Sequence, residues 1–433
     1  MKLWQKDNVS TNELIEKFTV GRDREFDLLL ARYDVQGSIA HVKMLKAVGL
    51  MNEKDAADAV RGLEDILKDI LDSKFIIEEG IEDVHSQVEY LLTQRIGEAG
   101  KKIHSGRSRN DQVAVDLKLY LRAETLNIKE EVKGLFDLLI AQSEKYKDKL
   151  LPGYTHLQIA MPSSFGLWFG AYAESLTDDL EMLAAAYHIT NKNPLGSGAG
   201  YGSSFPLNRT LTTQLLQFAT PNYNAVYAQM SRGKTEKAVA MGLGAVAATL
   251  SRLAMDACLY MNQNFGFISF PDELTTGSSI MPHKKNPDVF ELIRAKCNRI
   301  QATPNELTLL INNLPSGYHR DLQLTKEIVF PAIEELKACI QMTRLMLLNI
   351  RIKDNILDDE KYKYLFSVEA VNELVNSGVS FRDAYRRVGN DIAHGTFRFD
   401  YKKQLHHTHE GSLGNLCNDK IVEAMAGVLD KFV

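Results

Sequence analysis

Apolar residues in the middle of the chain have the spacing of a helix that packs along one continuous seam. Seven of them recur at alternating intervals of four and three residues: Val239, Leu243, Val246, Leu250, Leu253, Ala257 and Tyr260. This heptad spacing predicts a long helix packed against other helices. Between Lys237 and Asp256 the only charged residue is Arg252, and small residues occupy much of the other surface. We therefore expect this helix to be buried on every side inside a helical bundle.

A transmembrane span is the alternative interpretation of the same segment. The charge of Arg252 within the run, the charged flanks and the lack of a second such segment argue against it. A helix without a polar face needs more neighbours than one small domain supplies, so we expect that other subunits help to cover it.

Apolar residues at intervals of three and four predict further helices over about 108–149, 163–188, 286–313 and 326–349. The main breaks between them are rich in proline and glycine, as at Pro152-Gly153 and Pro315-Ser316-Gly317. The pattern predicts an all-α protein. A length of 433 residues exceeds the usual size of a single core and predicts two or three packed units.

The composition indicates the class of protein. Hydrophobic residues make up 45% and charged residues 25% of the chain, as in ordinary soluble proteins, and the net charge of −5 argues against nucleic acid or a membrane surface as partner. A small-molecule ligand is expected instead. The N-terminus meets charge too early for a secretion signal, which favours the cytoplasm. The cysteines form no Cys-x-x-Cys pair and predict reduced thiols without a zinc site: Cys258, Cys297, Cys339 and Cys417.

Three histidines and a glutamate lie near the C-terminal end: His406, His407, His409 and Glu410. Their spacing matches no common ligand pattern, so we expect an exposed polar turn and no metal.

The segment Gly277–Pro287 reads Gly-Ser-Ser-Ile-Met-Pro-His-Lys-Lys-Asn-Pro and has neither helical nor strand periodicity. Glycine permits unusual backbone geometry, the two prolines fix φ, and hydroxyl, ammonium and amide groups supply donors. A solvated surface loop is the simple alternative for this composition. The concentration of donors favours a loop that binds an anion.

Two further segments combine turns with chemically useful groups. Residues 103–112 open a long helix with two arginines, and free N–H groups at a helix start favour a carboxylate, although structural ion pairs are the alternative. Residues 152–158 present Thr155 and His156 in a turn just ahead of a helix. A packed structural histidine is the alternative there, but an imidazole with a pKa of about 6.5 suits acid–base catalysis.

A last segment, 314–326, places Tyr318, Gln323 and Lys326 around a turn and the first turns of a helix. Alone it would pass for a charged helix start without a function.

Taken together, these segments resemble the argininosuccinate lyases, a family of the fumarase/aspartase superfamily, over nearly the whole chain. The matching strings are Gly-Arg-Ser-Arg-Asn-Asp-Gln at 106–112, Gly-Tyr-Thr-His-Leu-Gln at 153–158, Pro-Leu-Gly-Ser-Gly-Ala at 194–199, Lys-Lys-Asn-Pro-Asp at 284–288 and Asp-Leu-Gln at 321–323. The resemblance implies a fumarase/aspartase-like fold with three helical domains around a long central helix bundle. The expected domains are an N-terminal helical domain (1–105), the central bundle (106–350) and a small C-terminal helical domain (351–433).

The resemblance also implies a carbon–nitrogen lyase that reversibly eliminates fumarate from argininosuccinate to give arginine, in arginine biosynthesis. It implies no cofactor and a homotetramer with composite active sites. By the match, Ser278 is the general base, Lys284 stabilises the charge that develops on a substrate carboxylate, and His156, polarised by Glu291, assists proton delivery to the leaving group. The remaining matched positions are expected to bind substrate: His85, Ser108, Arg109, Asn110, Thr155, Asn286, Tyr318, Gln323 and Lys326.

The chain departs from the family pattern in four places. Position 283 is His where Gln is usual, and Trp4 is followed by Gln5-Lys6 in place of a Gly-Gly-Arg-Phe string. Residues 18–27 do not align cleanly with the family's Asn-Ala-Ser element, and residues 222–237 lack its Ser-Asp-Arg-Asp run. These departures concern substrate recognition more than proton chemistry. Two alternatives stay open: a related lyase acting on another N-substituted succinate, such as adenylosuccinate or aspartate, and a non-catalytic structural protein of the same fold.

Overall fold

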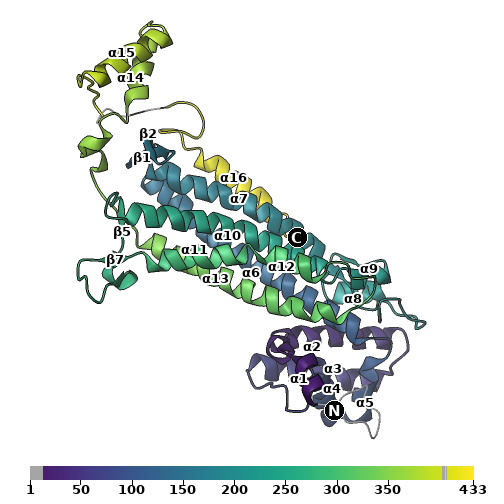
Figure 1. Cartoon of the computed structure of the whole chain (residues 1–433). Helices are drawn as coiled ribbons and strands as arrows, with labels where there is room; N and C mark the ends of the chain where they lie inside the picture. The colour runs from purple at the N-terminus through teal and green to yellow at the C-terminus, as the bar shows by residue number, and fades with distance from the viewer. Residues whose placement is uncertain (1–12, 402–404, 406) are drawn as a thin grey trace.

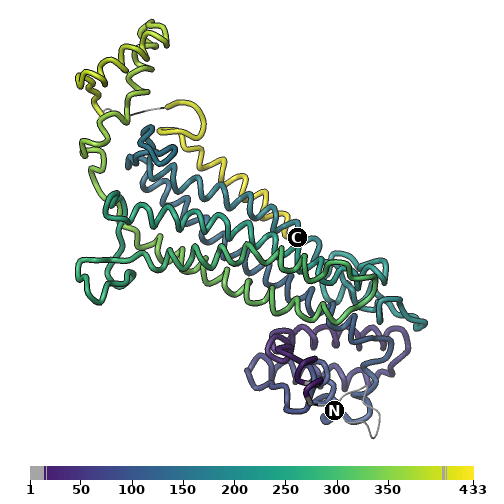
Figure 2. Tube along the Cα trace, viewed as in Figure 1, coloured from purple at the N-terminus to yellow at the C-terminus, as the bar shows by residue number. Residues whose placement is uncertain are grey.

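The structure, a computed structural model, describes residues 13–401, 405 and 407–433. The described chain is all-α, as predicted: long helices run side by side, and every strand is short. Figures 1 and 2 show a group of N-terminal helices at one end of the central bundle and a small helical group beyond the other end. The domain boundaries near residues 105 and 350 stay predictions, and Trp4 to Lys6 lie outside the described residues.

The N-terminal group surrounds a core of its own, formed by residues such as Val42, Leu63 and Leu92. Two of its helices begin at capping side chains. Asn52 Oδ1 accepts a hydrogen bond from the Asp55 N–H at 2.8 Å, and Asp83 Oδ1 accepts one from the Ser86 N–H at 2.7 Å. The elements are α1 (Glu13–Val20), α2 (Asp23–Ala47), α3 (Glu53–Leu71), α4 (Val84–Ile96), α5 (Glu98–Lys101) and the 3₁₀ helix η1 (Lys102–His104).

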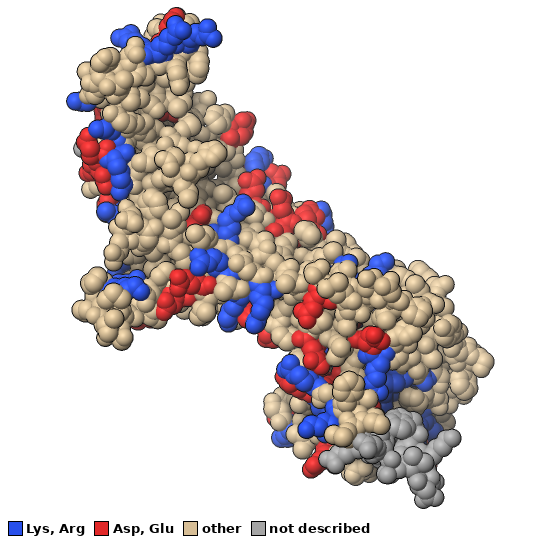
Figure 3. All heavy atoms as spheres, in the orientation of Figure 1, with Lys and Arg blue, Asp and Glu red and all other residues tan. Residues whose placement is uncertain are grey.

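The central bundle holds the largest hydrophobic core. Its elements are α6 (Arg109–Lys145), α7 (Phe165–Thr190), α10 (Lys234–Met261), α11 (Asp288–Ile300), α12 (Thr303–Leu310) and α13 (Thr325–Leu348). Shorter elements lie between them in the chain: α8 (Arg209–Leu215), α9 (Ala225–Met230) and the 3₁₀ helices η2 (Asp272–Leu274) and η3 (Arg320–Leu324). Charges of both signs are interspersed over the face of the molecule in Figure 3.

The heptad prediction is confirmed in α10, whose first six seam residues are buried. Burial on every side is wrong for the single chain, because Met241 and Met255 are 45% and 46% exposed, on one face with Arg252. Among the described helices α10 alone has the length and apolar composition to cross a membrane, and 56% of its most apolar window is buried. Packing against α7, α11, α12 and α13 accounts for that composition.

The helix predicted over 286–313 is two helices, α11 and α12, which meet at Gln301 and Ala302. Pro304 lies in the first turn of α12. Proline lacks the N–H that would continue the hydrogen bonds of α11, and its ring crowds the preceding turn, so one helix ends and another begins.

Within the described residues the strands form four two-stranded pairs, and the largest pair was not predicted. The hairpin of β1 (Leu150–Thr155) and β2 (Gln158–Ser164) is antiparallel and leads into α7, so the predicted turn at His156 precedes a strand and not a helix. The other pairs are β3 (Lys192–Asn193) with β4 (Thr220–Pro221), β5 (Ile268–Ser269) with β8 (Arg351–Ile352), and β6 (Thr276–Gly277) with β7 (Lys285–Asn286).

The C-terminal segment forms a small group and then returns to the bundle. Its elements are η4 (Ile356–Asp358), η5 (Glu360–Tyr362), α14 (Ser367–Asn376), α15 (Phe381–Ala393) and α16 (Asn418–Leu429). Figure 1 shows α16 along α7, while α14 and α15 project beyond the bundle. In the polar turn before α16, His407 lies near Glu369, His409 and Glu410 are exposed, and His406 lies outside the described residues.

Gly242→Ala is expected to destabilise the contact of α10 with α7. A Cβ atom at position 242 would lie 2.8 Å from Leu183 Cδ1 and 3.1 Å from Leu183 Cα. We expect the free energy of unfolding to fall by about 1–3 kcal/mol, because such overpacking displaces a helix backbone. A lower melting temperature would show this loss.

Gly244→Ala is the matched control in the same helix. The nearest atoms to a Cβ there are 3.9 Å away, so replacing a helical glycine should stabilise by roughly 0.5–1 kcal/mol. Equal melting temperatures for the two variants would contradict the packing argument.

Candidate active site

A cavity of about 340 Å³ lies between the N-terminal helices and the near ends of α6 and α13, and we call it the N-terminal pocket. It gathers residues from α2, α4, α6, η3 and α13. Six of the predicted substrate-binding residues line it: His85, Arg109, Asn110, Tyr318, Gln323 and Lys326.

The first turn of α6 is fixed by a capping box at Ser108 and Asp111. Ser108 Oγ accepts a hydrogen bond from the Asn110 N–H, and Asp111 Oδ1 accepts one from the Ser108 N–H at 2.9 Å. Asp111 Oδ2 accepts two more at 2.9 Å, from the N–H groups of Gly196 and Gly198. The structure thus gives Ser108 a capping role and joins the 194–202 loop to the edge of the pocket.

Arg109 is held by protein groups on the pocket wall. Its Nη1 donates to Gln112 Oε1 at 2.9 Å and its Nη2 to Ser86 Oγ at 3.1 Å. Its Nε lies 3.2 Å from Asp83 Oδ2. These contacts fix the guanidinium in place before any ligand binds.

Lys326 forms the strongest buried ion cluster of the pocket. Its Nζ lies 2.6 Å from Asp23 Oδ1 and 2.6 Å from Asp27 Oδ1, and its side chain is 4% exposed. Burial raises the pKa of Asp23 to about 6, and the nearby Asp27 adds to the rise although Lys326 opposes it. Asp23 therefore changes charge near neutral pH at the wall of the pocket.

Gln323 and Arg320 connect η3 to the first helix. Gln323 Nε2 donates to the Thr19 carbonyl at 3.0 Å, and Gln323 Oε1 accepts from Arg320 Nε at 3.1 Å. Tyr318 is 37% exposed, so its ring is the most open of the predicted groups at this wall.

Arg232 is a buried cation with unused hydrogen-bonding capacity. It is 6% exposed, lines the pocket and donates from Nη2 to the Leu322 carbonyl at 3.1 Å. Its Nε lies 3.5 Å from Glu236 Oε1, and neither Nε nor Nη1 has a hydrogen-bond partner among the described residues. Its guanidinium also lies 6.0 Å from the centre of the Tyr318 ring.

The pocket wall therefore carries both signs of charge. Its carboxylates are those of Asp23, Asp27, Glu82 and Asp83, and its cations are Arg109, Arg232, Arg320 and Lys326. Such a wall can bind a ligand that carries ammonium or guanidinium groups together with carboxylates.

The 277–287 loop lies elsewhere, at the tip of the β6–β7 hairpin. Ser278 Oγ accepts hydrogen bonds from the N–H groups of Ile280 at 3.3 Å and Met281 at 3.1 Å. Asn286 Nδ2 donates to the Gly277 carbonyl at 3.4 Å, and Lys285 forms an ion pair with Asp272. His283, Lys284 and Glu291, the last in the first turn of α11, are exposed.

His156 lies at the turn of the β1–β2 hairpin. His156 and Leu157 have φ of 52° and 58°, which fits a two-residue turn with both central residues in the left-handed region. Residues with a Cβ rarely adopt this region, which costs roughly 1–2 kcal/mol each. Thr155, His156 and Leu157 are all exposed. Among the described residues no contact joins His156 to Glu291.

Helix lengths separate these groups within one chain. The 37 residues of α6 span about 55 Å, with Asn110 at one end and the β1–β2 hairpin just beyond the other. The 24 residues of α13 span about 36 Å, with Lys326 at the start and β8, which pairs with β5 ahead of the 277–287 loop, beyond the end. Within one chain the N-terminal pocket, the β1–β2 hairpin and the 277–287 loop thus lie in separate places (Figure 1).

The sequence reasoning missed Asp23, Asp27 and Arg232 as pocket residues. They belong to the segments 18–27 and 222–237, where the family match fails. Asp23 and Asp27 are four residues apart, which puts both carboxylates on one helix face, and that spacing was the available signal. Lys326, the cation that pairs with both carboxylates, is about 300 residues away in the sequence. The spacing of the two aspartates alone therefore could not predict that they bind Lys326 at the pocket wall.

Comparisons with known proteins show which family the chain belongs to. The family described as Lyase matches residues 6–302 of the chain. The argininosuccinate lyase of Bacteroides thetaiotaomicron is 60% identical over 431 residues, which cover 100% of this chain and 96% of that protein. The argininosuccinate lyase of Stenotrophomonas maltophilia strain K279a is 37% identical over 384 residues, 89% of each chain.

Solved structures support the same fold. EDDS lyase in complex with formate aligns with a TM-score of 0.78 at 20% identity, over 98% of this chain and 91% of that chain. A fumarate lyase:delta crystallin from Brucella melitensis bound to cobalt aligns with a TM-score of 0.72 at 17% identity, over 96% and 94%.

Asp23→Asn is expected to flatten the pH dependence of stability between about pH 4 and 6. A carboxyl group whose pKa is higher in the folded than in the unfolded chain binds its proton more tightly when folded, so it reduces stability as pH rises through that window. The variant should lack this pH-dependent change in the free energy of unfolding, which is on the order of 1–3 kcal/mol.

Melting temperatures at about pH 4.5 and pH 6.5 measure the effect. Glu25→Gln is the control, because Glu25 is an exposed carboxylate on the same helix and pairs with Arg22. If the melting temperatures of wild type and Asp23→Asn change by the same amount between the two pH values, the Asp23 carboxyl titrates normally.

Proposed function

The chain belongs to the argininosuccinate lyases of the lyase family that it matches, and on that premise we propose its substrate, its mechanism and its assembly. It is a carbon–nitrogen lyase that eliminates fumarate reversibly from argininosuccinate and leaves arginine. We place this reaction in arginine biosynthesis in the cytoplasm. The observation that carries the proposal is 60% identity to an argininosuccinate lyase along the full chain.

Ser278 is the proposed general base. It removes a proton from the carbon next to a carboxylate of the succinyl group, and the electron pair of that C–H bond moves into the carboxylate. A serine hydroxyl is a very weak acid, so the alkoxide needs stabilisation. Two backbone N–H groups, those of Ile280 and Met281, already point at Ser278 Oγ and support this role.

The doubly charged carboxylate that results must be stabilised. Lys284 and Asn286 flank the loop tip and supply an ammonium and an amide for this purpose, and Lys284 is exposed and able to meet a substrate. Collapse of the dianion forms the C=C bond of fumarate and breaks the C–N bond. His156, polarised by Glu291, delivers a proton to the departing guanidino nitrogen directly or through water.

The N-terminal pocket is proposed to hold the amino-acid end of the substrate. Argininosuccinate carries three carboxylates, an ammonium and a guanidinium, and the pocket offers partners for both signs. Asn110, Tyr318, Gln323 and Lys326 bind there, with His85 and Arg109 beside them. Thr155 of the β1–β2 hairpin and Asn286 of the 277–287 loop bind the succinyl end, beside the proposed catalytic groups of the same two segments.

The active site is proposed to be composite, in a homotetramer. The distances along α6 and α13 leave the three groups apart in one chain, so one substrate can meet them only if different subunits contribute them. Exposed apolar residues on the bundle helices support association: Met182 on α7, Met241 and Met255 on α10, Leu292 on α11 and Leu345 and Leu348 on α13 are each at least 39% exposed.

Incubation of the purified protein with argininosuccinate tests the function. Release of fumarate, followed by its ultraviolet absorbance, is the expected result. Turnover of adenylosuccinate or aspartate with none of argininosuccinate would favour the related-lyase alternative, and no turnover of any of them would favour a structural protein. Ser278→Ala is the control for the chemical step and should lower kcat at least about a hundredfold while substrate still binds.

Mixing two inactive variants tests the composite site. Asn110→Ala and Ser278→Ala change residues at opposite ends of the bundle, so we expect each homotetramer to be inactive. After reversible dissociation and reassociation of a mixture, some sites should draw both residues from unmutated subunits and recover activity. Reassociation of each variant alone is the control. A mixture that forms tetramers by light scattering but stays inactive would contradict a site shared between subunits.

A further inference from the structure

We propose that Asp34 is a positioning residue that fixes the ring of His85, so that Nε2 of His85 is presented to the N-terminal pocket as a hydrogen-bond acceptor. This inference depends on the proposed function in one respect, which is that substrate binds in the N-terminal pocket. Asp34 itself does not line the pocket and acts through His85.

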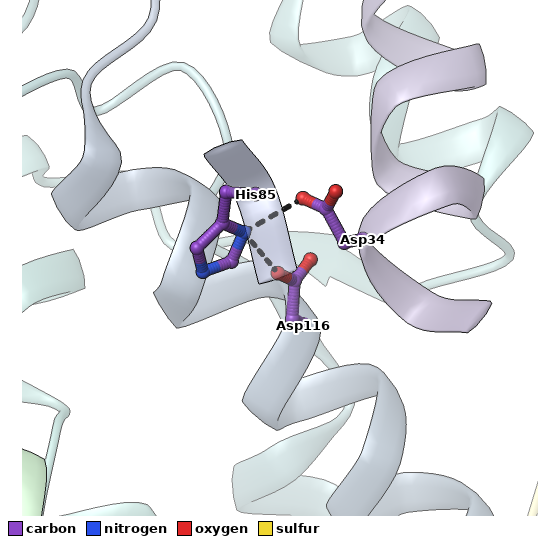
Figure 4. Close-up of side chains that lie close together, drawn as sticks. All are labelled: Asp34, His85 and Asp116. Carbon is purple, nitrogen blue, oxygen red and sulfur yellow. Dashed lines mark hydrogen bonds and ion pairs between the residues drawn. The ribbon is translucent and has the colours of Figure 1, made fainter. Parts of the chain in front are cut away.

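Three helices bring the groups together. His85 is in the first turn of α4, Asp34 is on α2 and Asp116 is on α6, and the three side chains are at most 2% exposed. His85 Nδ1 lies 2.9 Å from Asp34 Oδ1 and 3.4 Å from Asp116 Oδ2. Figure 4 shows both carboxyl groups facing the same ring nitrogen, while the other nitrogen points away from them.

The surroundings favour ionisation of Asp34 over ionisation of Asp116. Burial raises the pKa of Asp116 well above its ordinary range, and the charge of Asp34 raises it further; both oxygens of Asp116 lack a hydrogen-bond partner among the described residues. Burial acts in the same direction on Asp34, but the hydrogen bond from His85 Nδ1 at 2.9 Å and the charge of Arg107 favour its ionised form. Gln112 Nε2 also donates to Asp34 Oδ1 at 2.6 Å. Asp34 is therefore the anion and Asp116 its neutral neighbour.

An ionised Asp34 fixes the tautomer of His85. A carboxylate only accepts hydrogen bonds, so Nδ1 must carry a proton and donate it. In the neutral ring the lone pair then lies on Nε2, and because His85 also lines the pocket, this nitrogen can accept an N–H of the substrate's ammonium or guanidino group. An asparagine at position 34 could donate to Nδ1 instead and move the ring proton to Nε2.

A divalent cation is the competing occupant of this cluster. The three ligand atoms lie within 4.8 Å of one another, which is close enough for a shared ion. The buried guanidinium of Arg107, whose charge acts on both aspartates and whose Nη1 donates to Ser38 Oγ at 2.9 Å, already supplies the positive charge. The hydrogen-bond distance from Nδ1 to Asp34 likewise favours a proton between them over a metal.

The test compares Asp34→Asn with Asp116→Asn in the full-length enzyme. Both changes are isosteric, buried and beside the same ring nitrogen. We expect Asp34→Asn to lower kcat/KM on the order of a hundredfold, because the wrong tautomer removes the acceptor, as for a buried aspartate that orients a catalytic histidine. Asp116→Asn resembles the neutral acid already present and should stay within about threefold of wild type. Equal losses would indicate a merely structural role and overturn the proposal.

A double-mutant cycle shows whether the effect passes through His85. In a His85→Gln background Asp34→Asn should cost no further activity, and the two single variants should change the same parameter, kcat or KM. Additive losses would overturn the proposal. If Asp34→Asn does not fold, Asp34→Ala replaces it, since it removes the same carboxylate without a new donor; we expect a loss on the order of a hundredfold that vanishes in the His85→Gln background.

Two measurements separate the other outcomes. Elemental analysis of the wild-type tetramer that finds one equivalent of a divalent metal per chain, lost in Asp34→Asn, would overturn the proton-based account. Wild-type turnover of argininosuccinate is measured first, so a failure of the proposed function is seen before any variant is compared.

Discussion

The rigidity and length of the central helices constrain every other feature of this protein. An α-helix cannot bend back on itself, so α6 and α13 hold the N-terminal pocket about 55 Å from the β1–β2 hairpin and about 36 Å from the strands next to the 277–287 loop. The bundle is packed through α10, which contacts α7, α11, α12 and α13 with buried apolar residues and a close glycine contact at Gly242. Within a single chain the pocket, the hairpin and the loop therefore stay apart, which is the physical reason for proposing that further copies complete the site.

Buried charge is concentrated where the N-terminal helices meet α6 and α13. Lys326 lies between Asp23 and Asp27, Arg107 offsets Asp34, and Asp111 accepts hydrogen bonds from the backbone N–H groups of Gly196 and Gly198. Each of these groups would be costly to bury alone, so the cluster requires all its partners at once. That mutual dependence makes the pocket preorganised, and a polar substrate can bind without rearranging its walls.

The departures from the family pattern fall into two physical groups. The altered segments 18–27 and 222–237 supply Asp23, Asp27 and Arg232 to the wall of the pocket that is proposed to hold the amino-acid end. His283 lies on the exposed loop tip beside Lys284, far from that wall, and adds an imidazole to the loop that holds the proposed base. The altered pocket residues and the altered loop residue therefore lie near opposite ends of α13.

The sequence by itself determined the all-α class, the seam of α10, the approximate ends of α6, α7 and α13, and the family, because helical periodicity, capping residues and motif strings are local. It did not reveal the β1–β2 hairpin, since its turn uses His156 and Leu157 in place of glycine or asparagine, nor the break before Pro304. Only the tertiary structure decided which polar residues share a wall: Lys326 meets Asp23 and Asp27 across 299 or more positions, and His85 meets Asp34 and Asp116 from three helices. Such contacts depend on the way in which long helices pack together, and local sequence patterns do not determine distances across the bundle.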